Sequence, residues 1–349
     1  MKIYKYPTQE ELPALLKRPV RDASQLNATV AAVLADIKTQ GDAAVRMYEE
    51  KFDHVALQDL AVTEAEMQEA ETLVNVELKS ALQQAHDNIE KFHASQKFQA
   101  EHVQVTDGVE CWQQSVPIQK VGLYIPGGTA PLFSTVLMLA TPAKIAGCEE
   151  IVLCTPPAKD GKVNPAILVA ARIAGVSKIF KRGGVQAIGA MAYGTESVPK
   201  VYKIFGPGNQ FVMCAKQQVS LHDVAIDMPA GPSEVEVLAD ETSNPVFVAA
   251  DLLSQAEHGV DSQVLLVTKS EEIIDKVQQE VERQLALLPR NEIAAQALEY
   301  SKILLVRYSS SLCVCQDPLL SLCCPLWQMQ RLQGLRASCL ISGCSCSGL

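Results

Sequence analysis

The stretch Val121–Gly128, with the sequence VGLYIPGG, decides the fold of this 349-residue chain. Its first five residues form a short, mostly apolar run that ends at a Pro-Gly-Gly turn. A short apolar run bounded by turn residues is typical of a strand buried inside a sheet. We therefore expect the first strand of a central sheet at this position.

Strand-like and helical runs alternate after this strand. The strand-like runs lie at 151–154, 178–180 and 202–205, and the helical runs at 131–147, 164–174, 186–194 and 208–219. A second series follows Ala230-Gly231-Pro232, with strands at 234–238, 263–268 and 303–306 and helices at 245–258 and 270–288. Such alternation indicates βαβ units and parallel sheets. The sequence thus predicts an α/β fold of two Rossmann-like, doubly wound units.

The first hundred residues are helical by pattern. Apolar residues at helical spacing mark an early helix: Val30, Val33, Leu34 and Ile37. Thr63 and Glu66 have the spacing of a capping box, and a long helix with a polar face runs over about 76–96. We expect an N-terminal helical segment that carries no obvious chemistry.

The composition favours a globular protein with a small-molecule substrate. Apolar residues make up 48% of the chain, charged residues 20%, and the formal net charge is -10. This charge argues against nucleic acid and anionic membranes, since both need clustered Lys and Arg. The first 20 residues lack a signal-peptide pattern, and the most apolar window, Pro131–Cys148, is too interrupted to cross a bilayer. We expect a buried helix there and a cytoplasmic location for the protein.

The eleven cysteines are unevenly distributed. Four are scattered through the first 307 residues, as is common for cytosolic enzymes: Cys111, Cys148, Cys154 and Cys214. The other seven fall in the last 42 residues: Cys313, Cys315, Cys323, Cys324, Cys339, Cys344 and Cys346. This asymmetry separates the end of the chain from the rest.

Three glycine-rich turns follow strands of the first series, at 126–128, 183–184 and 206–209. Ligands of open α/β sheets bind at the carboxyl ends of strands, where glycine lets the backbone approach a phosphate. For any single turn, a purely structural role is the better interpretation. Three together favour a nucleotide site modestly, although the chain lacks the GxGxxG fingerprint of an ordinary Rossmann site.

Two further motifs are ambiguous when taken alone. Gln255 and His258 lie three residues apart near the end of a predicted helix, so both could bind one metal ion, or His258 could simply interact with the helix dipole. Ser233, in the Pro- and Gly-rich connection 225–234, could face a crevice between the two units or belong to a structural linker. The chain contains neither a GxSxG elbow nor a P-loop, which argues against a serine hydrolase and a nucleoside triphosphatase.

Taken together, four motifs resemble the histidinol dehydrogenase family. They are VGLYIPGG at 121–128, FGPGN at 205–209, IDMPAGPSE at 226–234 and LSQAEHG at 253–259. The resemblance extends from near the start of the chain to about Val306. It implies oxidation of L-histidinol to L-histidine through histidinal, with two NAD molecules and a zinc ion, by a homodimer in histidine biosynthesis.

The resemblance also implies roles for individual residues. Tyr124, Gln186 and Asn209 are similar to the family's NAD-contacting positions. Ser233, Gln255 and His258 resemble substrate contacts, and Gln255 and His258 are also two of the zinc ligands. We divide the chain into N-terminal helices with the start of the first α/β unit (1–120), an NAD-binding α/β unit (121–232), the remaining α/β part with the zinc and substrate residues (233–307), and a tail (308–349). We expect the N-terminal helices to join 233–306 in a second, discontinuous unit.

The tail departs from the family's pattern. The family continues with a Pro-Glu-His string that supplies the catalytic glutamate and histidine, followed by an aspartate and a histidine that complete the zinc site. This chain has no histidine after His258, so the catalytic pair and half of the zinc ligands are missing. The composition of 308–349 is typical of an out-of-frame translation and fits a metal-binding or membrane-proximal tail less well. We therefore expect a C-terminally truncated, inactive homologue; the alternatives are a non-catalytic NAD-binding remnant and a misfolded product without function.

Overall fold

The computed structural model describes residues 1–8, 10–16, 24–57, 59–127, 131–228, 234–260, 262–307, 339–341 and 344–346. Residue contacts divide the chain into two compact units. The continuous unit is Asp22–Ala230, and the split unit combines Met1–Arg21 with Gly231–Leu349.

The continuous unit is built on a five-stranded parallel sheet with the order β6-β5-β4-β7-β8. Its strands are β4 (Lys120–Tyr124), β5 (Glu150–Thr155), β6 (Lys178–Lys181), β7 (Lys203–Phe205) and β8 (Ala225–Ile226). The chain runs outward from β4 to β6 and then returns to the other side of β4 to form β7 and β8. The winding direction therefore reverses between β4 and β7, which confirms the doubly wound sheet and creates a topological switch point.

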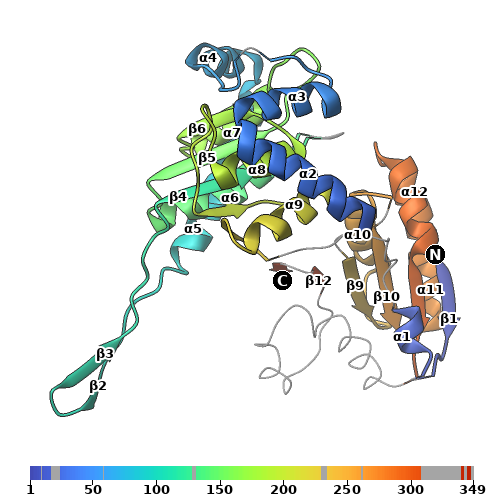
Figure 1. Ribbon diagram of the computed structural model, residues 1–349. Coiled ribbons are helices and arrows are strands. Elements are labelled where there is room, and N and C mark those ends of the chain that lie inside the picture. Colours follow the sequence, from blue (N-terminus) through green and yellow to red (C-terminus); the bar gives the residue numbers. More distant parts are fainter. Residues whose placement is uncertain are drawn as a thin grey trace. The chain divides into compact units, whose positions relative to one another are not determined.

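Helices cover both faces of this sheet (Figure 1). One face packs against α4 (Glu64–Leu73), α5 (Val76–Ala94), α6 (Phe133–Ala146) and α7 (Pro165–Ile173). The other packs against α2 (Ser24–Gln40), α3 (Asp42–Phe52), α8 (Gly184–Tyr193) and α9 (Gln210–Ser220). Successive side chains of β4 point to opposite faces of the sheet. Val121 and Leu123 pack in the core with α4–α7, and Tyr124 packs in the core with α2, α3, α8 and α9. Within this unit the four cysteines are free thiols, and only Cys111 is exposed.

Most of the N-terminal helices pack differently from our expectation, since only α1 (Leu12–Leu15) lies in the split unit. Instead of joining the second unit, α2 contacts α8 and α9, α4 contacts α7, and α5 contacts α6. The apolar stripe of α2 fits against a small residue of α8, because a Cβ at Gly189 would lie 2.9 Å from Ile37 Cδ1 and 3.2 Å from Leu34 Cδ2. The capping box of α4 is confirmed, with Thr63 Oγ1 accepting from the Glu66 amide and Glu66 Oε2 accepting from the Thr63 amide.

A β-hairpin projects from the continuous unit as a long arm (Figure 1). It consists of β2 (His102–Thr106) and β3 (Val109–Trp112), and every residue of both strands is exposed. Short β-type runs occur in the sequence from about Val103 onward, and we expected the sheet to begin with them. The first of these runs instead form this separate two-stranded sheet, and the central sheet begins at β4.

The split unit contains a mixed sheet with the order β1-β11-β10-β9-β12-β13. Four strands are parallel, namely β1 (Lys2–Lys5), β11 (Lys302–Leu305), β10 (Gln263–Thr268) and β9 (Glu234–Ala239). The antiparallel edge comprises β12 (Cys339–Ile341) and β13 (Cys344–Cys346). One face packs against α10 (Pro245–Ala256), α11 (Glu271–Leu285) and α12 (Asn291–Tyr300), while α1 (Leu12–Leu15) packs on the other. Apart from β12 and β13, our interpretation of the tail falls outside the described residues.

No helix in the described part of the chain has both the length and the apolar character that crossing a bilayer requires. The apolar window at 131–148 forms α6, which buries Val136, Leu137 and Ala140 against the sheet.

Candidate functional site

The turn after β7 lies against the end of β4 at the switch point. Gly206 has φ +129°, and a Cβ on it would lie only 2.1 Å from the carbonyl oxygen of Tyr124. The Gly206 carbonyl accepts from Lys216 Nζ at 2.7 Å, and its amide donates to Asp227 Oδ2 at 2.8 Å. Lys216 is 1% exposed and also forms an ion pair with Asp227. An ion pair between a buried lysine and a half-buried aspartate therefore fixes the turn at the place where a Rossmann-like sheet binds its ligand.

Two of the turn glycines are required by packing within the chain. A Cβ at Gly127 would lie 2.4 Å from Pro156 Cγ, and one at Gly208 would lie 2.3 Å from Val212 Cγ1. Neighbouring side chains thus leave no room for a Cβ at either position. For these two glycines the structural interpretation is sufficient; Gly128 lies outside the described residues.

The helices that follow the strands differ in how their N-termini are capped. The side chain of Asn164 caps α7, and Asn209 Oδ1 caps α9 by accepting from the amides of Phe211 and Val212 at 3.0 and 3.1 Å. At α8, protein side chains accept from the amides of Gly183 and Gly184. By contrast, α6 starts after Leu132 with no side-chain cap in the described part of the structure. This N-terminus follows β4, where the first βα turn of a dinucleotide-binding fold holds phosphate.

Tyr124 is the last residue of β4 and is buried. Its hydroxyl oxygen accepts from the Gly184 amide at 3.1 Å. Burial raises the pKa of Tyr124, so its hydroxyl keeps its proton at neutral pH and can donate to a ligand. The structure therefore connects Tyr124 with the turn between β6 and α8.

Gln186 lies in the first turn of α8 and is fully buried. Its Nε2 donates to Glu49 Oε2 at 3.0 Å and to Asp53 Oδ2 at 2.9 Å. Its Oε1 is buried and has no hydrogen-bond partner among the described residues. Glu49 Oε1 accepts from the Gly183 amide at 3.2 Å, and burial raises the pKa of Glu49 to about 8.

No sequence motif points to Glu49 or Asp53, because the N-terminal helices carry no obvious chemistry in the sequence. The available signal is weak: Glu49 places a carboxylate beside the buried residues Val45 and Tyr48 on α3. Asp53 follows four residues later, directly after the helix, at a spacing that brings two side chains together.

Asn209 is exposed at the start of α9. Its oxygen caps the helix, whereas its Nδ2 has no hydrogen bond within the described structure. Of the three predicted NAD-contacting residues, Tyr124 and Gln186 thus meet around the β6–α8 turn, and Asn209 follows the Gly206 turn that packs on Tyr124.

The predicted metal ligands belong to the split unit. Gln255 lies in the last turn of α10 and is 5% exposed, with Nε2 buried and without a partner among the described residues. The exposed His258 follows that helix, and its backbone amide donates to the Gln255 carbonyl at 3.2 Å. Ser233, the third predicted substrate contact, lies outside the described residues.

A complete four-ligand zinc site does not fit the residues that the structure describes. Gln255 and His258 are two neighbouring candidates, but no group of three His, Cys, Asp or Glu side chains within that part includes His258. The group that does occur there, His86, Asp87 and Glu90, lies on α5, and its two carboxylates are exposed. We consider it part of the polar face that the sequence predicts for this helix.

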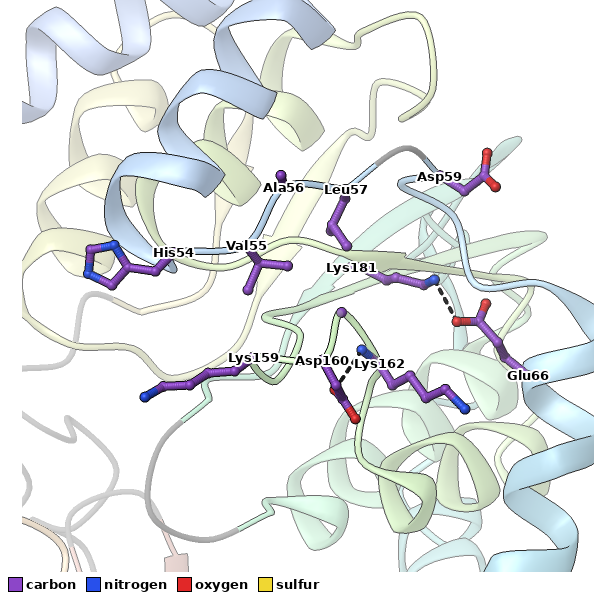
Figure 2. Close-up of a pocket in the computed structure, with 11 residues that line it drawn as sticks. His54, Val55, Ala56, Leu57, Asp59, Glu66, Lys159, Asp160, Lys162 and Lys181 are labelled. Carbon is purple, nitrogen blue, oxygen red and sulfur yellow. Dashed lines mark hydrogen bonds and ion pairs between the residues drawn. The ribbon is translucent and has the colours of Figure 1, made fainter.

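A separate open pocket of about 410 Å³ lies at the carboxyl ends of β5 and β6 (Figure 2). Two of its lysines form ion pairs with glutamates. Lys181 pairs with Glu66 at 2.5 Å, and Lys162 pairs with Glu69 at 2.7 Å. None of the predicted site residues lines this pocket. The pocket includes the end of β6, and β5 lies between β6 and β4, where the switch point is.

Comparisons with known proteins agree with the resemblance. The sequence profile described as "Histidinol dehydrogenase" matches residues 16–318 and so continues past residue 307, where we expected the family-like part to end. The histidinol dehydrogenase of Bacteroides thetaiotaomicron is 66% identical over 307 residues, which cover 88% of this chain and 72% of that protein. That of Xanthomonas euvesicatoria is 54% identical over 294 residues, covering 84% of this chain and 68% of that protein.

A solved structure gives the same result for the fold. The crystal structure of histidinol dehydrogenase from Elizabethkingia anophelis superimposes with a TM-score of 0.88 at 51% sequence identity. The match covers 91% of this chain and 73% of that one.

Proposed function

Because this chain belongs to the histidinol dehydrogenase family, oxidoreductases of histidine biosynthesis, we propose that its continuous unit binds NAD at the switch point between β4 and β7. The observation that carries this proposal is the N-terminus of α6, which follows β4 and has no side-chain cap among the described residues. Backbone amides and the helix dipole favour an anion at such an end, so the pyrophosphate is the group we assign to it.

Three side chains around this point are chemically suited to a dinucleotide. The Tyr124 hydroxyl keeps a proton that it can donate, and Asn209 has an amide nitrogen without a hydrogen bond in the described structure. Gln186 offers a buried oxygen without a partner there. NAD, when bound, would accept hydride from the substrate, and these residues would hold and orient it.

For the substrate side we propose L-histidinol, with Ser233, Gln255 and His258 as contacts. Gln255 and His258 would be two of the zinc ligands. Because structural and catalytic zinc sites need at least three protein ligands, we expect weak zinc binding. We also expect no oxidation of histidinol, since the chain contains no histidine after His258. The homodimer implied by the resemblance stays a prediction.

The test measures NAD binding and turnover separately on the purified 349-residue chain. We expect saturable NAD binding in a fluorescence or calorimetric titration, and no NADH absorbance when L-histidinol and Zn²⁺ are added. Tyr124→Phe should weaken NAD binding because it removes the hydroxyl that accepts from Gly184. The matched control is Tyr193→Phe, which removes a tyrosine hydroxyl at the other end of α8 from the Gly184 turn. Turnover of histidinol by this chain would contradict the inactivity, and absence of NAD binding would contradict the site.

One observation favours a second candidate function, a non-catalytic NAD-binding protein. All the elements assigned to the nucleotide site lie within the continuous unit. Loss of catalytic residues from the other unit would therefore leave these elements present. NAD binding that persists without histidinol oxidation is the result this candidate requires.

A further inference from the structure

We propose that Glu49 is a positioning residue of the nucleotide site: it fixes Gln186 so that the side-chain oxygen of Gln186, rather than its NH₂ group, faces the dinucleotide. This inference rests on the NAD site proposed above. It concerns a residue of α3 that never needs to touch the ligand.

The first step is the double contact made by the Glu49 carboxylate. Oε1 accepts from the backbone amide of Gly183 at 3.2 Å, and Oε2 accepts from Gln186 Nε2 at 3.0 Å. Both contacts are buried, and Glu49 is only 1% exposed. One carboxylate thus connects the start of α8 to its first turn and fixes the local backbone together with the glutamine side chain.

The second step follows from the number of protons on the Gln186 amide. An amide NH₂ has two hydrogens, and the carboxylates of Glu49 and Asp53 accept one each. The remaining polar atom, Oε1, is buried and without a partner in the described structure. Because that atom can only accept, it would pair with a hydrogen-bond donor of the dinucleotide, such as a ribose hydroxyl or an amino group, and not with a phosphate oxygen.

The third step concerns the space beside this oxygen. Gly184 has φ +53°, and a Cβ there would lie 2.9 Å from Gln186 Oε1. A side chain at this position would push the oxygen away, so the glycine is needed for this placement of the Gln186 amide. The Gly184 amide is itself held by the Tyr124 hydroxyl. Two predicted NAD-contacting residues are therefore joined through a turn that Glu49 also holds.

Protonation of Glu49 would disturb this arrangement. The titratable or charged groups that act on it are Asp53 directly after α3, Arg182 directly after β6, Tyr124 from β4 and Cys154 from β5. Burial is the largest influence and raises the pKa of Glu49 to about 8. When the carboxyl is protonated, one of its oxygens carries an O–H donor that faces an N–H donor of Gly183 or Gln186. Rotation of the Gln186 amide, which would turn its oxygen toward this O–H, is then favoured. NAD affinity should therefore rise as the pH increases through about 8.

The experiment is a titration of the full chain with NAD between pH 6.5 and 9.5. For the unaltered protein we expect the dissociation constant to fall several-fold across this range. Glu49→Gln should bind NAD roughly tenfold more weakly at pH 9, which is the effect expected from losing one hydrogen bond. The NAD affinity of this variant should not change with pH. Glu50→Gln, the exposed neighbour on the same helix, is the matched control and should retain the profile of the unaltered chain.

The outcomes separate this inference from the NAD site itself. If the unaltered chain binds NAD and Glu49→Gln leaves both the affinity and the pH profile unchanged, the role of Glu49 is overturned while the site stands. If the unaltered chain binds no NAD, both are overturned. Asp53→Asn provides a second variant, since it alters the other acceptor for the Gln186 amide and should also weaken binding. Circular dichroism spectra matching the unaltered chain would show that each variant is folded.

Discussion

At the scale of single residues, two buried charged groups of the continuous unit occupy opposite electrostatic situations. Lys216 has a carboxylate partner in Asp227 and a carbonyl acceptor at Gly206. Glu49 accepts two hydrogen bonds, but its contact with Gln186 is to a neutral amide and its neighbour Asp53 is also acidic. Burial outweighs the attraction of the Arg182 guanidinium, so the Glu49 carboxyl favours its protonated form.

The raised pKa of Glu49 predicts how folding stability depends on pH. In the folded state its pKa is about 8, whereas the unfolded chain has the ordinary value of 4.5. The folded protein thus binds one more proton between these values, and the free energy of unfolding should fall as the pH rises across that window, by up to about 1.4 kcal/mol per pH unit. Glu49→Gln should remove this contribution.

Urea unfolding at pH 5.5, 7 and 8.5 measures the effect. Glu50→Gln should follow the unaltered chain, because Glu50 is exposed. A pH dependence that is identical in Glu49→Gln and the unaltered protein would show that Glu49 is ionised throughout the folded state.

At the scale of elements, the junction of β4 and β7 depends on a glycine that no other residue can replace without strain. Gly206→Ala has two unfavourable effects. It places an alanine at a φ of +129°, and its Cβ would lie 2.1 Å from the Tyr124 carbonyl oxygen. The backbone conformation alone costs about 1–3 kcal/mol, and the overlap adds to this. We expect a loss of stability beyond that range, together with loss of NAD binding.

Gly108→Ala in the β2–β3 hairpin is the control for this substitution. Gly108 also has a positive φ, +79°, but a Cβ there meets nothing within 4 Å. It should cost only the backbone strain, about 1–2 kcal/mol, and leave NAD binding unchanged. Thermal unfolding of both variants checks this, and equal losses would show that contact with Tyr124 is unimportant.

The sequence predicts elements that are strongly periodic or follow one another locally. Helix α6 was expected at 131–147 and occurs at Phe133–Ala146, and the Thr63 capping box is present. β1 was missed because Lys2–Lys5 is only four residues long, has a lysine at each end and is stabilised by pairing with β11, about 300 residues later. Glu49 was missed for a related reason: its partners Gly183 and Gln186 are far away in sequence, and no local pattern reports burial of a lone glutamate.

At the scale of the whole molecule, two compact units share one chain. Proteins with more than one domain often unfold in more than one step. We expect differential scanning calorimetry to show two transitions, and Gly206→Ala to lower only the one that belongs to the continuous unit. A single transition that this substitution shifts as a whole would instead mean that the units unfold together.

The pairing of β1 with β11 has a consequence for synthesis on the ribosome. The continuous unit is complete once residue 230 has been made, so it can fold while the chain is still growing. Lys2–Lys5, in contrast, must wait for Lys302–Leu305 before it gains its partner strand. At typical translation rates this delay is on the order of tens of seconds. Lys2–Lys5 is therefore made before the continuous unit but is among the last segments to pair, and its strand edge stays unpaired during that interval.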